Sequence, residues 1–188
     1  MCEGRMKKDL VKIIVLYLID QLQDNGSPIS TIRIIKYLYL LDLEYYNGHF
    51  KTFTGINWIR YTYGPYFFAW PNIVNEIGYR LSVEEIKTDR GDGFTYRVDE
   101  PYRIDDKVPF GVQKMIDRIV KKWGDEDLEE ILNHVYASLP VEESKLNEEI
   151  DFTIETDHLL LEKAVEDAES FDTLSEFYEE IIDRKSVV

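Results

Sequence analysis

Hydrophobic residues recur three and four positions apart over the first quarter of the chain, the spacing of helices with one buried face. A first helix is predicted from about Lys7 to Gln23, where Asn25-Gly26 supplies a typical stop. Either Ser27-Pro28 or Ser30 can cap a second helix, and the short connection predicts that the two helices pack as neighbours. The first apolar stripe comprises Leu10, Val11, Ile14, Val15, Leu18, Ile19 and Leu22, and the second comprises Ile32, Ile35, Leu38, Leu41, Asp42 and Tyr45.

The pattern then changes from helical to extended. A polar loop is expected over residues 48–55, and the β-branched and aromatic run Ile56–Tyr63 predicts a short strand or an extended segment. Gly64-Pro65 should break that strand. Pro71 suits the first turn of a third helix, which should reach about Gly78.

A β-hairpin and two more helices are predicted next. The alternating runs Ser82–Thr88 and Phe94–Val98 flank a turn that contains two glycines. A fourth helix follows Pro109 and ends at Gly124. A fifth helix should be capped by Asp125 and stopped by Pro140, and residues 141–155 should form a loop.

The last part of the chain predicts one or two amphipathic helices. Apolar residues from Leu159 to Ala168 form one stripe, and Thr173–Glu176 resembles a capping box before a second stripe. We therefore expect a mostly α protein with a small β-hairpin, an α+β class. A compact domain over residues 1–152 should have a winged-helix-like order of elements, and residues 153–188 should form a helical extension.

Composition agrees with one folded domain. The chain has 188 residues, of which 44% are apolar, and it has no uninterrupted apolar run of the length that a membrane span needs. Lys12 and Asp20 interrupt the apolar run after the basic N-terminus, so we expect a first helix rather than a signal peptide. The single cysteine, Cys2, cannot form an internal disulfide, which fits a cytoplasmic protein.

Charge is distributed unevenly. Residues 1–124 contain 18 Lys or Arg and 16 Asp or Glu, a net +2, whereas residues 125–188 contain 4 and 21, a net −17, giving −15 for the chain. Such an acidic region repels nucleic acid and anionic lipid and attracts a basic partner. It is equally explained as the solvated face of acidic helices.

Several short motifs occur in an order that resembles the Panacea antitoxin-domain family, which includes SocA-like and phage-associated GepA-like proteins. The similarity covers about residues 7 to 152. One departure is Val141, where the family has a tryptophan after a proline. The matching residues are Ile34–Asp42 with Lys36, Tyr39 and Asp42, then Gly48, Thr54-Gly55 and Trp58, then Tyr63-Gly64-Pro65, then Leu132-Asn133-His134 with Pro140, and Ile150-Asp151-Phe152.

The resemblance implies a mostly helical domain with a small β element. It also implies that the protein neutralises a toxin by direct protein contact, or that it is an adapter that delivers a toxin to an AAA+ protease. Structural roles are implied for Lys36, Asp42, Gly64, Pro65, His134 and Pro140.

The residues give little support for an enzyme. His49, His134 and His158 are far apart and none is paired with another histidine or cysteine at helical spacing, so we predict no metal site and no cofactor. No activated nucleophile or phosphate-binding glycine loop is evident. His134 is best explained as a structural histidine that donates to a backbone carbonyl, and a functional role is the alternative.

Direct DNA binding is a second hypothesis. The order of helices and hairpin resembles a winged helix, but the would-be recognition helix carries Glu76 and only Arg80 as a cation. The hairpin turn adds Arg90 together with two aspartates. Groove-reading surfaces usually present several Lys or Arg, so these charges argue against nucleic acid.

Protein binding is the function that we predict. Aromatic residues are concentrated between positions 61 and 70, a composition typical of interface hot spots, and a basic toxin is the expected partner. The alternative is that they are core residues, and we expect about half of them to be buried. The predicted partner-binding residues are Tyr39, Trp58, Tyr61, Tyr63, Tyr66, Phe67 and Trp70.

Overall fold

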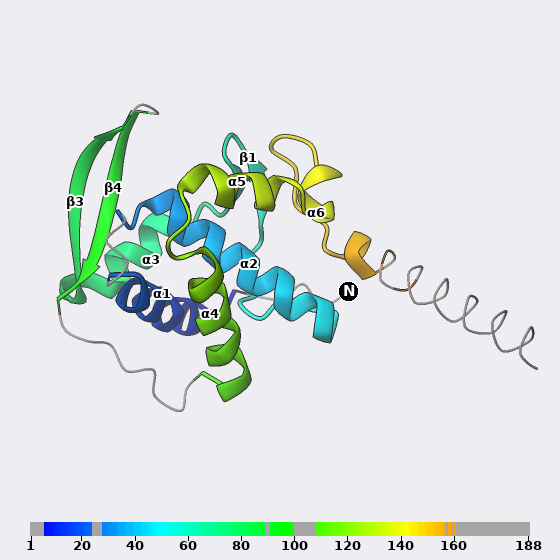
Figure 1. Ribbon diagram of the computed structural model, residues 1–188, viewed down its shortest axis with the longest axis horizontal. Coiled ribbons are helices and arrows are strands. Elements are labelled where there is room, and N and C mark those ends of the chain that lie inside the picture. The colour runs from blue at the N-terminus through cyan, green and yellow to red at the C-terminus, as the bar shows by residue number, and fades with distance from the viewer. Residues whose placement is uncertain are drawn as a thin grey trace, which may run out of the picture. The chain divides into compact units, whose positions relative to one another are not determined.

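The computed structural model describes residues 6–23, 28–88, 91–99, 108–156, 158 and 160 (Figure 1). The chain divides into two units, Met1–Phe152 and Thr153–Val188. The fold described here is that of the first unit. Most of the two helical stripes predicted after residue 158 lies outside the described residues.

The described part is mostly helical, with two separate two-stranded antiparallel sheets, which confirms the predicted fold class. The helices are α1 (Lys8–Leu22), α2 (Thr31–His49), α3 (Trp70–Ile77), α4 (Phe110–Trp123), α5 (Leu128–Tyr136) and α6 (Leu139–Glu142), with a 3₁₀ turn η2 (Gly78–Arg80) after α3. The strands are β1 (Ile59–Tyr61), β2 (Gly64–Tyr66), β3 (Leu81–Thr88) and β4 (Gly91–Val98).

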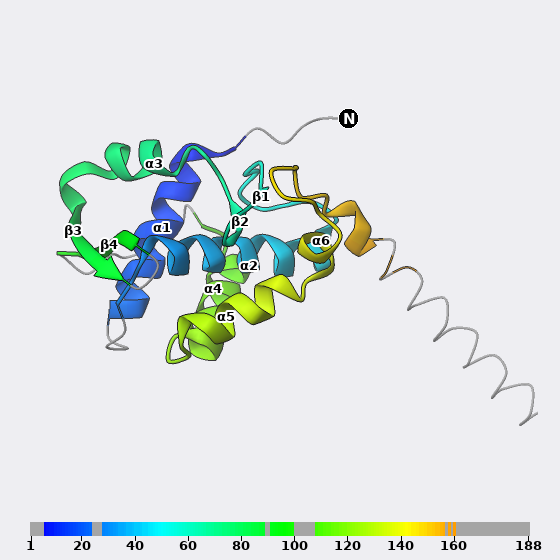
Figure 2. The same cartoon turned by 90° about the horizontal axis from the view of Figure 1, so that it is seen from above.

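Helix α2 is the central element. It contacts α1, α4, α5, β2 and β4, and it runs through the middle of the domain in both views (Figures 1 and 2). Of the two predicted caps, Ser30 is the one used, because its hydroxyl accepts a hydrogen bond from the N–H of Arg33 at 3.3 Å. The sequence predicted one buried stripe along this helix, but all consecutive residues from Arg33 to Asp42 are buried. A helix that is covered on every side has no solvent face to show in its pattern.

The segment after α2 forms a ladder that the sequence did not predict. β1 and β2 pair antiparallel, with Ile59 opposite Tyr66 and Tyr61 opposite Gly64. The predicted break at Gly64-Pro65 is wrong, because both residues belong to β2. Gly64 has a φ of +82°, which lets the chain reverse after a two-residue turn, and proline is tolerated in so short a ladder.

The hairpin β3–β4 is present, with Val83 opposite Tyr96 and Glu85 opposite Phe94. Its second strand begins at Gly91, so the two glycines predicted in the turn belong to β4. Helix α3 precedes it with Pro71 in the first turn, as predicted.

Two helix boundaries also differ from prediction. Asp127, rather than Asp125, caps α5, and its carboxylate accepts from the N–H of Glu130 at 2.9 Å. Helix α5 ends at Tyr136, and Pro140 lies in the first turn of α6, where a missing N–H costs nothing.

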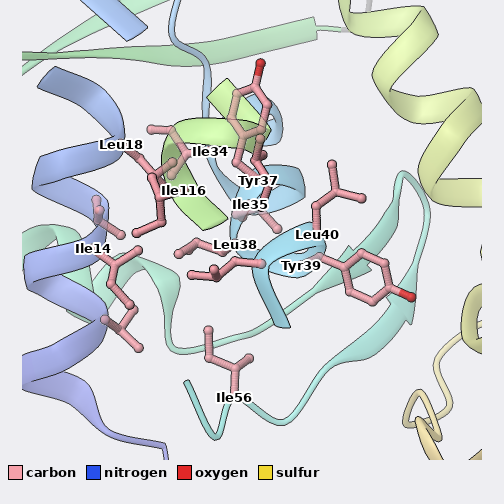
Figure 3. Packing of buried hydrophobic residues seen from close by; sticks show 14 of the residues in the cluster. Ile14, Leu18, Ile34, Ile35, Tyr37, Leu38, Tyr39, Leu40, Ile56 and Ile116 are labelled. Atoms are coloured by element: carbon pink, nitrogen blue, oxygen red, sulfur yellow. The ribbon is translucent and has the colours of Figure 1, made fainter. Parts of the chain in front are cut away.

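The core forms where α1, α2 and α4 meet (Figure 3). Ile14 and Leu18 of α1 lie against Ile35 and Leu38 of α2, and Ile116 of α4 completes the cluster; each exposes 1% or less. No helix among the described residues is long and apolar enough to cross a membrane.

Candidate functional site

Helix α2 carries three charged side chains that are almost completely buried. Arg33, Lys36 and Asp42 expose 5%, 2% and 0% of their surface. Charged residues are rarely buried to this degree unless their polar atoms are paired. Each of the three binds a different neighbouring segment of the chain.

The carboxylate of Asp42 fastens the loop after α2 to the helix. One oxygen accepts from the N–H groups of Phe53 and Thr54, both at 2.9 Å. The other accepts from the Thr54 hydroxyl and from Nε1 of Trp58, the latter at 2.9 Å. Burial raises the pKa of Asp42 above its ordinary value, and these hydrogen bonds oppose the rise. The Thr54 and Trp58 positions of the sequence motif are therefore structural.

The ammonium group of Lys36 holds the Tyr-Gly-Pro segment against α2. Its Nζ donates to the carbonyl oxygen of Pro65 at 2.8 Å. A Cβ at Gly64 would lie 3.3 Å from Cε1 of Tyr136 and 3.4 Å from Nζ of Lys36, so glycine allows this close approach. Burial, with a smaller effect from the charge of Arg60, lowers the pKa of Lys36 to about 7.

A third attachment involves Arg33, which sequence reasoning missed. Its guanidinium donates to the carbonyl oxygens of Gly124 at 3.3 Å and Glu126 at 2.9 Å, in the link between α4 and α5. The Tyr37 hydroxyl donates to the carbonyl of Trp123 at 2.7 Å. The available signal was a cation within an otherwise apolar run, because a buried guanidinium needs several acceptors.

Four of the seven aromatic residues predicted to contact a partner lie in the core. Tyr39, Trp58, Phe67 and Trp70 each expose 3% of their surface or less. They form a continuous row of edge-to-face ring contacts, with centroids 5.5, 5.5 and 6.0 Å apart. The structure therefore places these four predicted residues in the core, where a side chain has almost no surface to offer a partner.

The other three lie at the surface. Tyr61 and Tyr63 expose 41% and 40%, and Tyr66 is half-buried. Phe68, which exposes 64%, contacts the rings of Tyr61 and Tyr66 at 5.8 and 5.7 Å. We name Tyr61, Tyr66 and Phe68 the aromatic patch. Its rings cover one another only in part and leave apolar surface exposed to solvent.

A groove of about 920 Å³ opens beside the aromatic patch. Its lining comes from the start of α2, the β1–β2 turn and β2, α3, the β3–β4 hairpin and the first turn of α5, elements that are labelled in Figures 1 and 2. Tyr63, Tyr66 and the small exposed part of Trp70 line it, so three predicted residues meet here. The apolar lining residues that sequence reasoning did not assign to a site are Ile32, Pro71, Val74, Val83, Ile86, Phe94 and Leu128.

The floor of the groove, around Thr31, Trp70 and Tyr96, carries polar groups that are already paired with one another. The hydroxyls of Thr31 and Tyr96 lie 2.8 Å apart, and Nε1 of Trp70 donates to the Tyr96 hydroxyl at 3.4 Å. Such paired groups need no hydrogen bond from an occupant. The floor is therefore suited to apolar side chains.

The rim of the groove is acidic. Asp92 contributes from the hairpin, and Asp127 and Glu129 contribute from the first turn of α5. No lysine or arginine is found among the described residues that line the groove. Lys87, opposite Asp92 in the ladder, is a cation close by. The lining itself therefore carries only negative formal charge.

His134 and Pro140 lie away from the groove lining. The His134 ring packs 4.5 Å from the ring of Trp123, and partial burial, followed by the charge of Lys122, lowers the pKa of His134. Pro140 is buried beside Val141, which exposes 1%. Both contacts are packing contacts.

Within the described ranges, no group of three His, Cys, Asp or Glu residues could hold a metal ion. Comparison with protein-family models, with curated proteins and with solved structures finds no match. The groove and the aromatic patch are the features from which a function can be argued.

Proposed function

We propose that this chain is a non-enzymatic protein-binding domain that neutralises a basic partner by direct contact, as an antitoxin does. The observation that carries the proposal is an apolar groove with an acidic rim, joined to the aromatic patch through Tyr66. Exposed aromatic rings next to a concave apolar surface are typical of protein interfaces. The resemblance to the antitoxin family, based on the motifs of residues 34–65, points in the same direction.

The chemistry of the buried charges favours binding over catalysis. Arg33, Lys36 and Asp42 are the groups whose burial would suit an active site. Each is occupied in holding a backbone segment, through the bonds to Glu126, Pro65 and Thr54. These residues therefore have an architectural task that explains their burial.

The uneven charge of the chain supports a basic partner. Residues 125–188 carry a net −17, which attracts a cationic protein from a distance and increases the rate of association more than the affinity. The acidic rim then favours cations at the contact itself. Neutralisation would follow when the partner's active surface is covered.

The test is co-expression of the chain with the product of the adjacent reading frame. We expect the two proteins to co-purify and the chain to rescue growth from the neighbour's toxicity. The variant Phe94→Ser, which alters the groove, should weaken both effects, whereas Phe110→Ser should not. Phe94 and Phe110 are both exposed, at 47% and 71%, so both variants should fold. Absence of both co-purification and rescue would refute the proposal.

A DNA-binding regulator is the alternative, because α3 is followed by the β3–β4 hairpin as in a winged helix. The charge pattern opposes it. Glu76 of α3 pairs with Lys12 of α1 at 3.0 Å, and the neighbouring groove has an acidic rim that repels phosphates. Gel shift with the DNA upstream of the gene, at low and moderate salt, separates the two functions: binding at either salt supports the regulator.

A further inference from the structure

The groove combines an apolar depth with a negative rim, and this combination specifies the chemistry of its occupant. Apolar walls come from five elements, through Ile32, Val74, Val83, Phe94 and Leu128. We infer that the groove receives the apolar face of an amphipathic α-helix of the partner, with lysine or arginine along the edge of that face. The inference rests on the proposed function and adds which segment of the partner is recognised.

The hydrogen bonds that the backbone of the bound segment needs indicate whether it is a helix or a strand. Beside the groove, β4 is paired with β3 on one edge and with residues 29–30 on the other, through the Tyr96 N–H to Ile29 carbonyl bond of 3.0 Å and the bridge between Ser30 and Thr95. A strand added to the outer edge of β3 would extend the sheet and leave the groove unfilled. An extended peptide in the groove would lack partners for its backbone groups, whereas a helix satisfies them internally.

The polar groups inside the groove agree with this choice. The hydroxyls of Thr31 and Tyr96 are bonded to each other, and the Trp70 indole donates to Tyr96. The hydroxyl of Ser30 caps α2. These paired groups have little to offer a peptide backbone, whereas the apolar walls offer contact area to leucine-like side chains.

The charges around the groove indicate which polar residues should flank the apolar face of the partner's helix. Asp92 and Glu129 stand at the groove without a lysine or arginine among the described lining residues, and Asp127 adds a carboxylate that also caps α5. Lysine or arginine placed beside the apolar face would meet these groups, while glutamate or aspartate would be repelled. Lys87, near the end of the hairpin, weakens this preference locally, so we place the strongest attraction at the first turn of α5.

The experiment titrates a synthetic helix into the full-length chain by calorimetry. The probe is a peptide of about 18 residues, long enough to form a helix when bound, with leucine at positions i, i+3, i+4 and i+7 and lysine beside them. One control replaces every lysine with glutamate, and a second places proline in the middle. We expect the first peptide to bind and both controls to bind at least about tenfold more weakly.

Variants of the chain separate groove binding from attraction to its acidic C-terminal region, which carries a net −8 over residues 153–188. Phe94→Ser, Val83→Ser and Glu129→Lys should each weaken binding of the lysine peptide by about tenfold. Phe110→Ser and Glu142→Lys are matched surface changes outside the groove and should leave binding within about twofold. Thermal unfolding verifies that each variant is folded.

Three results would overturn the inference: equal weakening by groove and control variants, equal binding of the proline-containing peptide, or equal binding of the glutamate peptide. The natural partner distinguishes this failure from failure of the proposed function. If the partner co-purifies and is neutralised but Phe94→Ser and Glu129→Lys have no effect on its affinity, the groove is not its binding site and the neutralising function stands. If no partner is bound or neutralised, the function itself fails.

Discussion

Helix α2 borders two regions that differ in burial and bonding: one around Lys36 and Asp42, and the groove at the start of the helix. Around Lys36 and Asp42 the polar atoms are buried and bonded, and no buried side-chain nitrogen or oxygen in the described part lacks a hydrogen-bond partner. At the groove, where α2 begins, apolar side chains such as Phe94 and Val83 remain 47% and 44% exposed. The sequence motif of α2 therefore holds the fold together, whereas the exposed apolar residues of the groove lie mostly outside the recognised motifs.

The largest expected effect is at the buried carboxylate. Asp42→Ala leaves the N–H groups of Phe53 and Thr54 and the indole of Trp58 without an acceptor, and should cost about 3–5 kcal/mol of unfolding free energy. Urea denaturation measures it. Asp42→Asn keeps one acceptor oxygen and should cost less. A loss for Asp42→Ala below about 1 kcal/mol would show that this region is not the structural anchor we describe.

The next effect is a pH dependence due to Lys36. Its pKa in the folded chain is lowered to about 7, so between pH 7 and pH 10 the unfolded chain binds more protons than the folded one. Stability contributed at this site therefore rises with pH through that window. Lys36→Met removes the titrating group, and the stability difference between wild type and variant should change by about 2 kcal/mol in favour of wild type from pH 7 to pH 9.

Denaturation series at several pH values provide the measurement for Lys36. Using the difference between the two chains cancels the titration of groups that both retain. Parallel stability curves for wild type and Lys36→Met would show that Lys36 is not desolvated as the structure indicates.

A smaller effect on stability is expected at Gly64, where the Tyr-Gly-Pro segment approaches Tyr136 and Lys36 closely. Gly64→Ala puts a Cβ at a positive φ and near Tyr136, and should destabilise by about 1–2 kcal/mol. A Cβ added at Gly111, in α4, would meet no other atom within 4 Å, so Gly111→Ala is the matched control and should be stabilising by about 0.5–1 kcal/mol. Thermal or urea unfolding would reveal whether the two substitutions differ in sign.

The smallest effect on stability is expected at the groove. Phe94→Ser should change the unfolding free energy by no more than about 1 kcal/mol, because the ring is half exposed. Its effect should be on partner binding instead. A large loss of stability from this substitution would place Phe94 with the structural residues and remove the contrast between the two regions.

Helices and the hairpin were predictable because they depend on local signals. The Ser30 cap and the Pro71 helix start were each visible in a few consecutive residues. The β1–β2 ladder was missed because Gly64-Pro65 was interpreted as a break. The ladder is held against α2 by a bond to Pro65 from Lys36, which lies 29 positions away in the chain.

The groove could not be predicted for a similar reason. Its walls combine Ile32, Val74, Phe94 and Leu128, which no sequence pattern brings together. The aromatic run was correctly expected to divide between core and surface, but the residues of each kind could not be separated. Phe67 and Phe68 are neighbours in sequence, yet they expose 2% and 64%.

The most direct test of the account is a map of hydrogen exchange in the full-length chain with and without its partner. We expect new protection in α3, in the β3–β4 hairpin and in the first turn of α5, which line the groove. Little change is expected in the loop held by Asp42, which is already bonded in the free chain. Protection confined to regions away from the groove would contradict it.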